Sequence, residues 1–255
     1  MTTNGRVRLN VGATAIPIDA VTMDEAVAAV VSMNEPGWRY VVTPNLNHLR
    51  RVKDDPRAAV VYEDAFLSLP DGWPVGWLAS RVTGRSVDRV CGSDLFARIL
   101  ALPGRGKPLG LVGGQAGPGL TALMARAESN GWKPFQEPAL RPEIEDPARR
   151  RALLGRLVSR GDGGIVVLGV GAPRDEDLAR SIAGMAGRGL VLCLGMSINF
   201  SSGLAKRAPR AVQSLKLEWA HRALQEPGRL VPRYLRDARV LLPLAAQNRR
   251  VTRSF

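Results

Sequence analysis

The 255-residue chain is poor in side chains on which several kinds of protein depend. It has two cysteines, Cys91 and Cys193, which are too far apart for a zinc ribbon or a redox Cys-x-x-Cys motif and too few for a disulfide framework. With only two histidines, a histidine-rich catalytic metal site is excluded. Aromatic residues make up 5% of the chain, which disfavours a surface that stacks nucleic-acid bases.

Long apolar runs are also missing. No stretch reaches the roughly 18–20 apolar residues of a membrane-spanning helix, and residues 1–6 lack the apolar segment of a signal peptide. We therefore expect a protein of the reducing cytoplasm. The length suits one large domain with an appendage, and the 45% of hydrophobic residues exclude wholesale disorder.

Positive charge, by contrast, is in excess. The chain has 36 Lys and Arg against 23 Asp and Glu, a net charge of +13. Residues 201–255 hold 12 of these cations and 3 of the acids, which gives +9 there and +4 for the first 200 residues. Leucine, tryptophan and tyrosine alternate with these arginines at helical spacing, which is typical of amphipathic helices on an anionic bilayer. The alternative is an ordinary C-terminal helix with solvated arginines, whereas no nucleic-acid reader motif is present.

Five apolar runs, each followed by a turn and a helical pattern, predict strands at residues 39–43, 65–69, 109–112, 165–168 and 190–194. Strands between helices predict an α/β fold with a mainly parallel sheet covered on both faces. Ligands of such folds bind at the carboxyl ends of the strands. Because the composition turns basic near Gly203, we predict an α/β domain of residues 1–203 and a basic amphipathic appendage of residues 204–255.

Two of the predicted strand ends carry groups that could act in catalysis or substrate binding. Asp71 directly follows a strand, where its carboxylate can act as a general base toward a sugar hydroxyl or can shape the turn and cap the next helix. Both interpretations stay open. Residues 113–119 offer backbone N–H groups at a helix start, a cradle for a diphosphate, although the glycine spacing fits neither a Walker A loop nor a Rossmann fingerprint.

The triplet Asp175-Glu176-Asp177 spells the Asp-x-Asp pattern with which many metal-dependent glycosyltransferases hold a divalent cation. It follows Pro173 at a predicted helix start, where acidic side chains complement the helix dipole. The second interpretation is favoured, so neither a metal ion nor another cofactor is predicted.

Taken together, several segments resemble one family, the WecG/TagA/CpsF glycosyltransferases of bacterial cell-surface polymer synthesis. In family order, the matching stretches are residues 42–45, 69–72, 89–95, 111–114, 168–173, 203–209, 217–219, 222 and 224–230. The resemblance implies a Rossmann-like fold of the GT-E type. It also implies an inverting, metal-independent transfer of a sugar from a UDP-sugar to a polyprenyl-diphosphate-linked sugar at the cytoplasmic face of the inner membrane.

The same resemblance assigns roles to particular residues. It places Asp71 on the proposed catalytic base, Thr43 and Asn45 in the adjoining pocket, and Arg89 on a pocket arginine. It also implies that the appendage supplies arginines to the diphosphate and docks peripherally on the anionic membrane surface. Some family members form dimers or trimers, so a homo-oligomer is a further expectation, and no nucleic-acid partner is expected. The other candidate substrate-binding residues are Gly113, Gly114, Asp175, Asn199, Arg207, Arg222 and Arg229.

The chain departs from the family pattern at three places that border the donor site. Asp175 stands where the family usually has a pocket glutamine, and Asn199 replaces a nucleotide-side aspartate. A Gly-Tyr-Phe segment expected near residues 137–142 is absent. These changes leave the reaction type better supported than the donor. Two alternatives stay open: a metal-dependent glycosyltransferase using Asp175 and Asp177, and a non-catalytic, membrane-docking protein that binds nucleotide-sugars.

Overall fold

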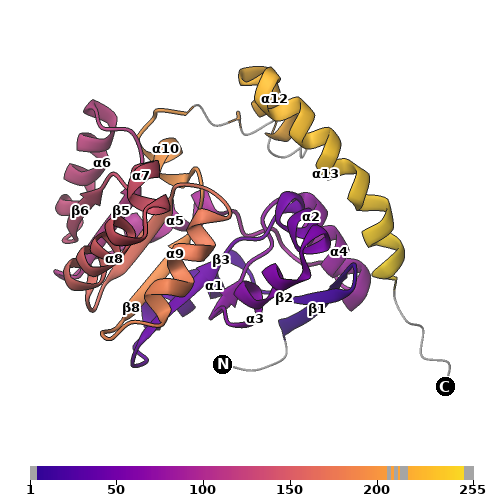
Figure 1. Cartoon of the computed structure of the whole chain (residues 1–255), viewed down its shortest axis with the longest axis horizontal. Coiled ribbons are helices and arrows are strands. Elements are labelled where there is room, and N and C mark those ends of the chain that lie inside the picture. Colours follow the sequence, from indigo (N-terminus) through magenta and orange to yellow (C-terminus); the bar gives the residue numbers. More distant parts are fainter. Residues whose placement is uncertain (1–4, 206–207, 210–211, 213–217, 250–255) are drawn as a thin grey trace.

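A parallel sheet of six strands lies among helices in the α/β part of the molecule (Figure 1). Its strand order is β4-β3-β8-β7-β5-β6. The computed structural model describes residues 5–205, 208–209, 212 and 218–249. The strands are β3 (Trp38–Val42), β4 (Leu67–Ser68), β5 (Pro108–Gly113), β6 (Lys133–Glu137), β7 (Ile165–Gly169) and β8 (Gly189–Cys193). The α/β fold with a parallel, Rossmann-like sheet is thus confirmed.

Alternate residues of the central strands feed two separate cores, because successive side chains of a strand point to opposite faces. Val166 and Leu168 join the core on one face, and Ile165 and Val167 join the core on the other. The first face is covered by α2 (Leu46–Asp54), α3 (Val60–Glu63), α4 (Trp73–Thr83), α7 (Arg141–Glu145), α8 (Pro147–Gly161) and α9 (Arg174–Ala183). The second is covered by α1 (Met23–Ser32), α5 (Gly92–Ala101), α6 (Pro118–Ser129) and α10 (Ser197–Ser201).

Three strands lie outside the predicted ones. The strands β1 (Arg6–Val11) and β2 (Thr14–Asp19) form a separate antiparallel hairpin. In β1, buried and exposed side chains alternate, so it lacks the continuous apolar run of a strand buried on both faces. The edge strand β6 contains Pro134, which an edge position tolerates. The structure also shortens the predicted strand at 65–69 to β4.

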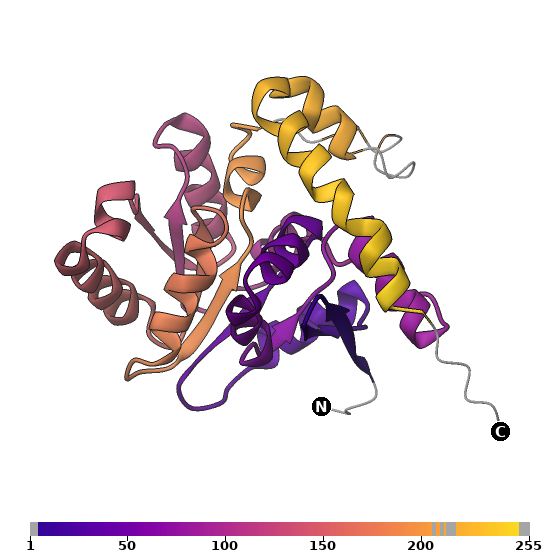
Figure 2. The same ribbon diagram turned by 45° about the vertical axis from the view of Figure 1, so that its right-hand side comes forward.

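The chain ends in two helices, α12 (Glu218–Gln225) and α13 (Pro227–Gln247). Figures 1 and 2 show α13 lying along α2, α4 and β1, which it contacts. Its residues Val240 and Leu244 belong to the core of the first sheet face. Directly after the helix, the Asn248 side chain accepts a hydrogen bond from the Asn10 N–H and donates one to the Asn10 carbonyl, both at 2.8 Å. The last turn of α13 is therefore anchored to the N-terminal hairpin.

None of the described helices is both long and apolar enough to span a bilayer.

Two glycines near the sheet offer a matched test of the packing. A Cβ added to buried Gly164 would lie 2.2 Å from the Pro108 carbonyl oxygen, whereas one added to Gly155 in α8 would meet nothing within 4 Å. We expect Gly164→Ala to lower the free energy of unfolding by about 1–3 kcal/mol, because the clash involves backbone of the neighbouring strand. Gly155→Ala should raise it by about 0.5–1 kcal/mol, because alanine favours the helix. Urea unfolding measures both values, and similar shifts for the two variants would contradict this packing.

Candidate functional site

A pocket of about 340 Å³ opens beyond the carboxyl ends of β3, β4, β7 and β8. This is where ligands bind in open parallel sheets. The sheet side contributes Thr43, Asp71 and the loops after β7 and β8, and the last two helices contribute charged side chains from the other side. These charged residues are Glu218, Arg222, Arg229 and Arg233. The pocket therefore joins the α/β body to α12 and α13.

The backbone places Asp71 beside the end of β3. The Leu69 N–H donates to the Val42 carbonyl and the Asp71 N–H donates to the Pro44 carbonyl at 3.0 Å, so the parallel pairing continues past β4. Gly72 then turns the chain into α4 with a φ of +79°, a conformation that a residue with a Cβ rarely adopts. The structure thus positions Asp71 by backbone pairing and a glycine turn, as a residue that lines the pocket.

The surroundings of Asp71 make its carboxylate more basic. Burial raises its pKa above the usual value, while the positive charge of Arg89 and a hydrogen bond from Cys91 oppose the rise only in part. Burial also raises the pKa of the Cys91 thiol to about 12, so the thiol keeps its proton and can donate it in that hydrogen bond. A carboxylate with a raised pKa is better suited to accept a proton from a hydroxyl.

The first turn of α2 forms the floor of the pocket. Asn45 caps this helix, since its side chain accepts a hydrogen bond from the Asn47 N–H, and its own N–H donates to His48 Nδ1 at 3.0 Å. Because Nδ1 accepts, Nε2 carries the proton and points to Glu176 Oε1, also at 3.0 Å. His48 lies outside the predicted site residues, and its signal in the sequence is its place three residues after an asparagine cap. Thr43 is fixed separately, by a hydrogen bond to the Cys193 carbonyl.

Glu176 is a second pocket residue that the sequence patterns missed. Burial raises its pKa, but the hydrogen bond from His48, together with a backbone hydrogen bond and the positive charge of Arg51, keeps the pKa below its usual value. Its Oε2 atom is buried and has no hydrogen-bond partner among the described residues. Glu176 therefore presents an ionised oxygen that a substrate hydroxyl could satisfy.

Asp175 holds two loops of the pocket together. Its carboxylate accepts hydrogen bonds from the N–H groups of Val170, Gly171 and Gly195, at 2.9, 3.1 and 3.2 Å. Burial and the neighbouring charge of Glu176 raise its pKa to about 7. The first two donors lie after β7 and the third lies after β8, so Asp175 fixes these loops relative to each other.

The two outer members of the acidic triplet face different ways. Asp175 is 2% exposed, whereas Asp177 is exposed and lies about 200° further around α9. The structure does not bring them together. Within the described part of the chain, no group of three His, Cys, Asp or Glu side chains is arranged to hold a metal ion.

The predicted arginines have different places. Arg222 and Arg229 line the pocket, with Arg222 5.6 Å from the centre of the Phe200 ring and Arg229 paired to Glu226. Arg89 does not line the pocket itself, but its Nη1 atom is 2.8 Å from Oε1 of Glu218, which does. Arg233, which lies outside the predicted site residues, lines the pocket beside Arg229. Arg207 lies outside the described residues.

Three other predicted residues lie outside the pocket lining formed by the described residues. Gly113 and Gly114 both have positive φ, and a Cβ on Gly114 would lie 2.9 Å from the Ile198 side chain. Their glycine character therefore serves close packing against α10 and the loop after β7. Asn199 lies nearby, with its Nδ2 atom 3.5 Å from Met196 Sδ. Contact of these three residues with a substrate stays a prediction.

Comparison with known families identifies the chain. A family model described as the glycosyl transferase WecG/TagA/CpsF family matches residues 11–254. The match spans the parallel sheet, the whole pocket and both C-terminal helices. The family resemblance of the sequence is thereby confirmed over nearly its full length. The chain belongs to the WecG/TagA/CpsF family of glycosyltransferases, enzymes of cell-surface polysaccharide synthesis.

Proposed function

We propose that this glycosyltransferase moves a sugar from a UDP-sugar to a polyprenyl-diphosphate-linked sugar, with inversion and without a metal ion. The observation that carries the proposal is that one pocket contains both a candidate base and several arginines. Asp71 stands on the sheet side, and Arg222, Arg229 and Arg233 stand on the side of α12 and α13. A base near a set of phosphate-binding cations is the arrangement that sugar transfer from a nucleoside diphosphate needs.

Asp71 acts on the acceptor in this mechanism. Its carboxylate takes the proton of the acceptor hydroxyl while the hydroxyl oxygen forms a bond to the anomeric carbon of the donor sugar. The bond from that carbon to the diphosphate oxygen breaks at the same time, and its electron pair leaves with UDP. Attack from the face opposite the leaving group inverts the anomeric configuration.

The arginines act on the leaving group. Breaking the glycosidic bond adds negative charge to the diphosphate, and guanidinium groups stabilise this charge through paired N–H donors that match phosphate oxygens. Arg229 and Arg233 are one helical turn apart on α13, so both can approach one diphosphate. Asp175 holds the two loops together and does not bind the donor sugar, because both of its oxygens already accept hydrogen bonds from backbone N–H groups.

The outer surface of the last two helices supports docking on the membrane that carries the acceptor. Arg236 and Arg239 are exposed there among apolar side chains. Amphipathic helices of this composition lie in the interface of anionic bilayers, where each cation contributes about 1 kcal/mol. The exposed apolar residues are Trp219, Leu224, Val231, Leu235 and Leu242. We therefore place the enzyme peripherally on the cytoplasmic face of the inner membrane.

A donor screen tests this function. Purified protein is incubated with individual UDP-sugars and a polyprenyl-diphosphate-linked sugar in anionic vesicles, and the mass of the lipid product is read directly. We expect one UDP-sugar to add a single sugar residue, with equal rates in the presence and absence of a chelator. Loss of activity with a chelator, restored by manganese or magnesium, would overturn the metal-free mechanism. Binding of UDP-sugars without any product would support a non-catalytic protein.

A further inference from the structure

We propose that Asp237 is a positioning residue, whose carboxylate holds the arginines of α13 over the pocket through an ion pair with Arg50 of α2. This assignment rests on the proposed function in one respect, because that function gives Arg229 and Arg233 a diphosphate to bind. Neither Asp237 nor Arg50 lines the pocket. Both therefore act through the side chains that they hold.

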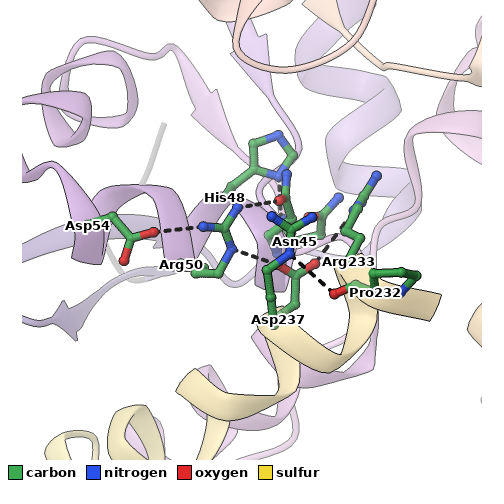
Figure 3. Close-up of polar contacts among 9 residues, drawn as sticks. Asn45, His48, Arg50, Asp54, Pro232, Arg233 and Asp237 are labelled. Carbon is green, nitrogen blue, oxygen red and sulfur yellow. Dashed lines mark hydrogen bonds and ion pairs between the residues drawn. The ribbon is translucent and has the colours of Figure 1, made fainter. Parts of the chain in front are cut away.

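Asp237 lies between two arginines at the interface of α13 with the body (Figure 3). Its Oδ1 atom is 2.9 Å from Arg50 Nε, and its Oδ2 atom is 3.5 Å from Arg233 Nε. The residue is 3% exposed, although it sits on a helix whose neighbouring positions 236 and 238 face solvent. A carboxylate buried to this degree needs cations beside it, because an unpaired buried charge is strongly unfavourable.

Arg50 connects this carboxylate to the floor of the pocket. Its Nη2 group donates to Asn47 Oδ1 at 3.3 Å, and its Nη1 group is 2.7 Å from Asp54 Oδ2. Asn47 belongs to the first turn of α2, which also carries Asn45 and His48, and all three line the pocket. The Asp237–Arg50 pair thus joins α13 to the helix that forms the pocket floor.

The spacing along α13 shows what the pair controls. Arg229, Arg233 and Asp237 occur at intervals of four residues and so share one face of the helix. The apolar contacts of Val240 and Leu244 hold α13 against the body, but apolar packing is not directional. The hydrogen bonds of Asn248 with Asn10 fix the last turn of the helix, and the ion pair fixes its rotation three turns earlier, next to the arginines. A rotation by one residue, about 100°, would turn the arginine face away from the pocket.

The experiment compares Asp237→Asn with Asp54→Asn. Both variants remove a carboxylate from the same arginine, but Asp54 is exposed and its ion pair with Arg50 lies within α2, whereas the pair of Asp237 joins α2 to α13. Two readouts are measured on the full chain: the rate of tryptic cleavage after Arg239 under native conditions, and the kcat and KM of transfer with the donor found in the screen. The first readout does not depend on the proposed function.

For Asp237→Asn we expect cleavage in α13 to accelerate at least tenfold and kcat/KM to fall at least tenfold, with most of the fall in the KM for the donor. Asp54→Asn should stay within twofold of wild type in both readouts. The double variant Arg50→Gln/Asp237→Asn should be no worse than the poorer single variant, because the two side chains act as one pair. Unchanged cleavage in Asp237→Asn would show that the Asp237–Arg50 pair does not hold α13 in place. Faster cleavage with unchanged kcat and KM would show that Asp237 does not position the arginines for transfer. If wild type transfers no sugar at all, the proposed function fails, while the cleavage rates still decide whether the Asp237–Arg50 pair holds α13 in place.

Discussion

In the Asp71→Asn variant, transfer to the lipid-linked acceptor should slow by a factor of about 10²–10⁴, the usual contribution of a positioned general base. Asparagine has nearly the same shape as aspartate but cannot take the proton of the acceptor hydroxyl. Because the substitution leaves the pocket shape intact, the loss should appear in kcat and not in the KM for the donor. Single-turnover measurements with saturating donor and acceptor check this directly.

The pH profile adds an independent test of the same residue. Burial raises the pKa of Asp71, so the fraction of ionised base falls as the pH drops, beginning at a higher pH than for an exposed aspartate. The acidic limb of kcat/KM should therefore follow this raised pKa in wild type and vanish in Asp71→Asn. Asp88→Asn is the control, because Asp88 is exposed and lies outside the pocket. Near-normal transfer by Asp71→Asn would show that another group is the base.

The Asp175→Asn variant should gain stability relative to wild type as the pH rises. The folded state raises the pKa of Asp175 from 3.8 to about 7, so between these values the native state binds a proton that the unfolded state has released. Stability that depends on this group is complete below pH 3.8 and is lost as the pH rises through 7. Between pH 5 and pH 8, the linkage relation gives a loss of about 2–3 kcal/mol in wild type. Asparagine carries no titrating group and escapes this loss.

Urea unfolding of both proteins at pH 5 and pH 8 measures this difference. Asp177→Asn is the matched control on the same helix, since Asp177 is exposed and we expect its variant to follow wild type at both pH values. If the stability difference between Asp175→Asn and wild type stays constant with pH, the carboxylate of Asp175 does not titrate in this range. At pH 5 the variant should be the weaker protein, because an amide cannot reproduce all three backbone hydrogen bonds.

The strands of the sheet interior were predictable because they are buried on both faces. Their apolar runs mark both ends of β3, β5, β7 and β8 to within one residue. The edge strand β6 and the hairpin strand β1 have one side open or alternate in polarity, so a search for continuous apolar runs passes over them. Continuous apolar runs thus locate the interior strands of the sheet but not its edge strand β6 or the hairpin.

The site was predictable only as far as strand ends determine it. Thr43, Asn45 and Asp71 follow strands directly, so the sheet itself brings them together. The contact of His48 with Glu176 joins residues of α2 and α9 that are 128 positions apart, and that of Arg89 with Glu218 joins residues 129 positions apart. No local pattern encodes such contacts. Arg233 could not be told from the other basic residues of its helix until the rotation of α13 was known.

The hydrogen bonds between Asn248 and Asn10 have a consequence for the order in which parts of the protein fold during synthesis. These residues are 238 positions apart, so the contact cannot form until residue 248 has left the ribosome. The sheet can close earlier, since its last strand ends at Cys193. A nascent chain would thus hold a folded sheet with an open pocket, and the arginines of α13 would arrive last. The pocket is in this sense completed only after the sheet beneath it has formed.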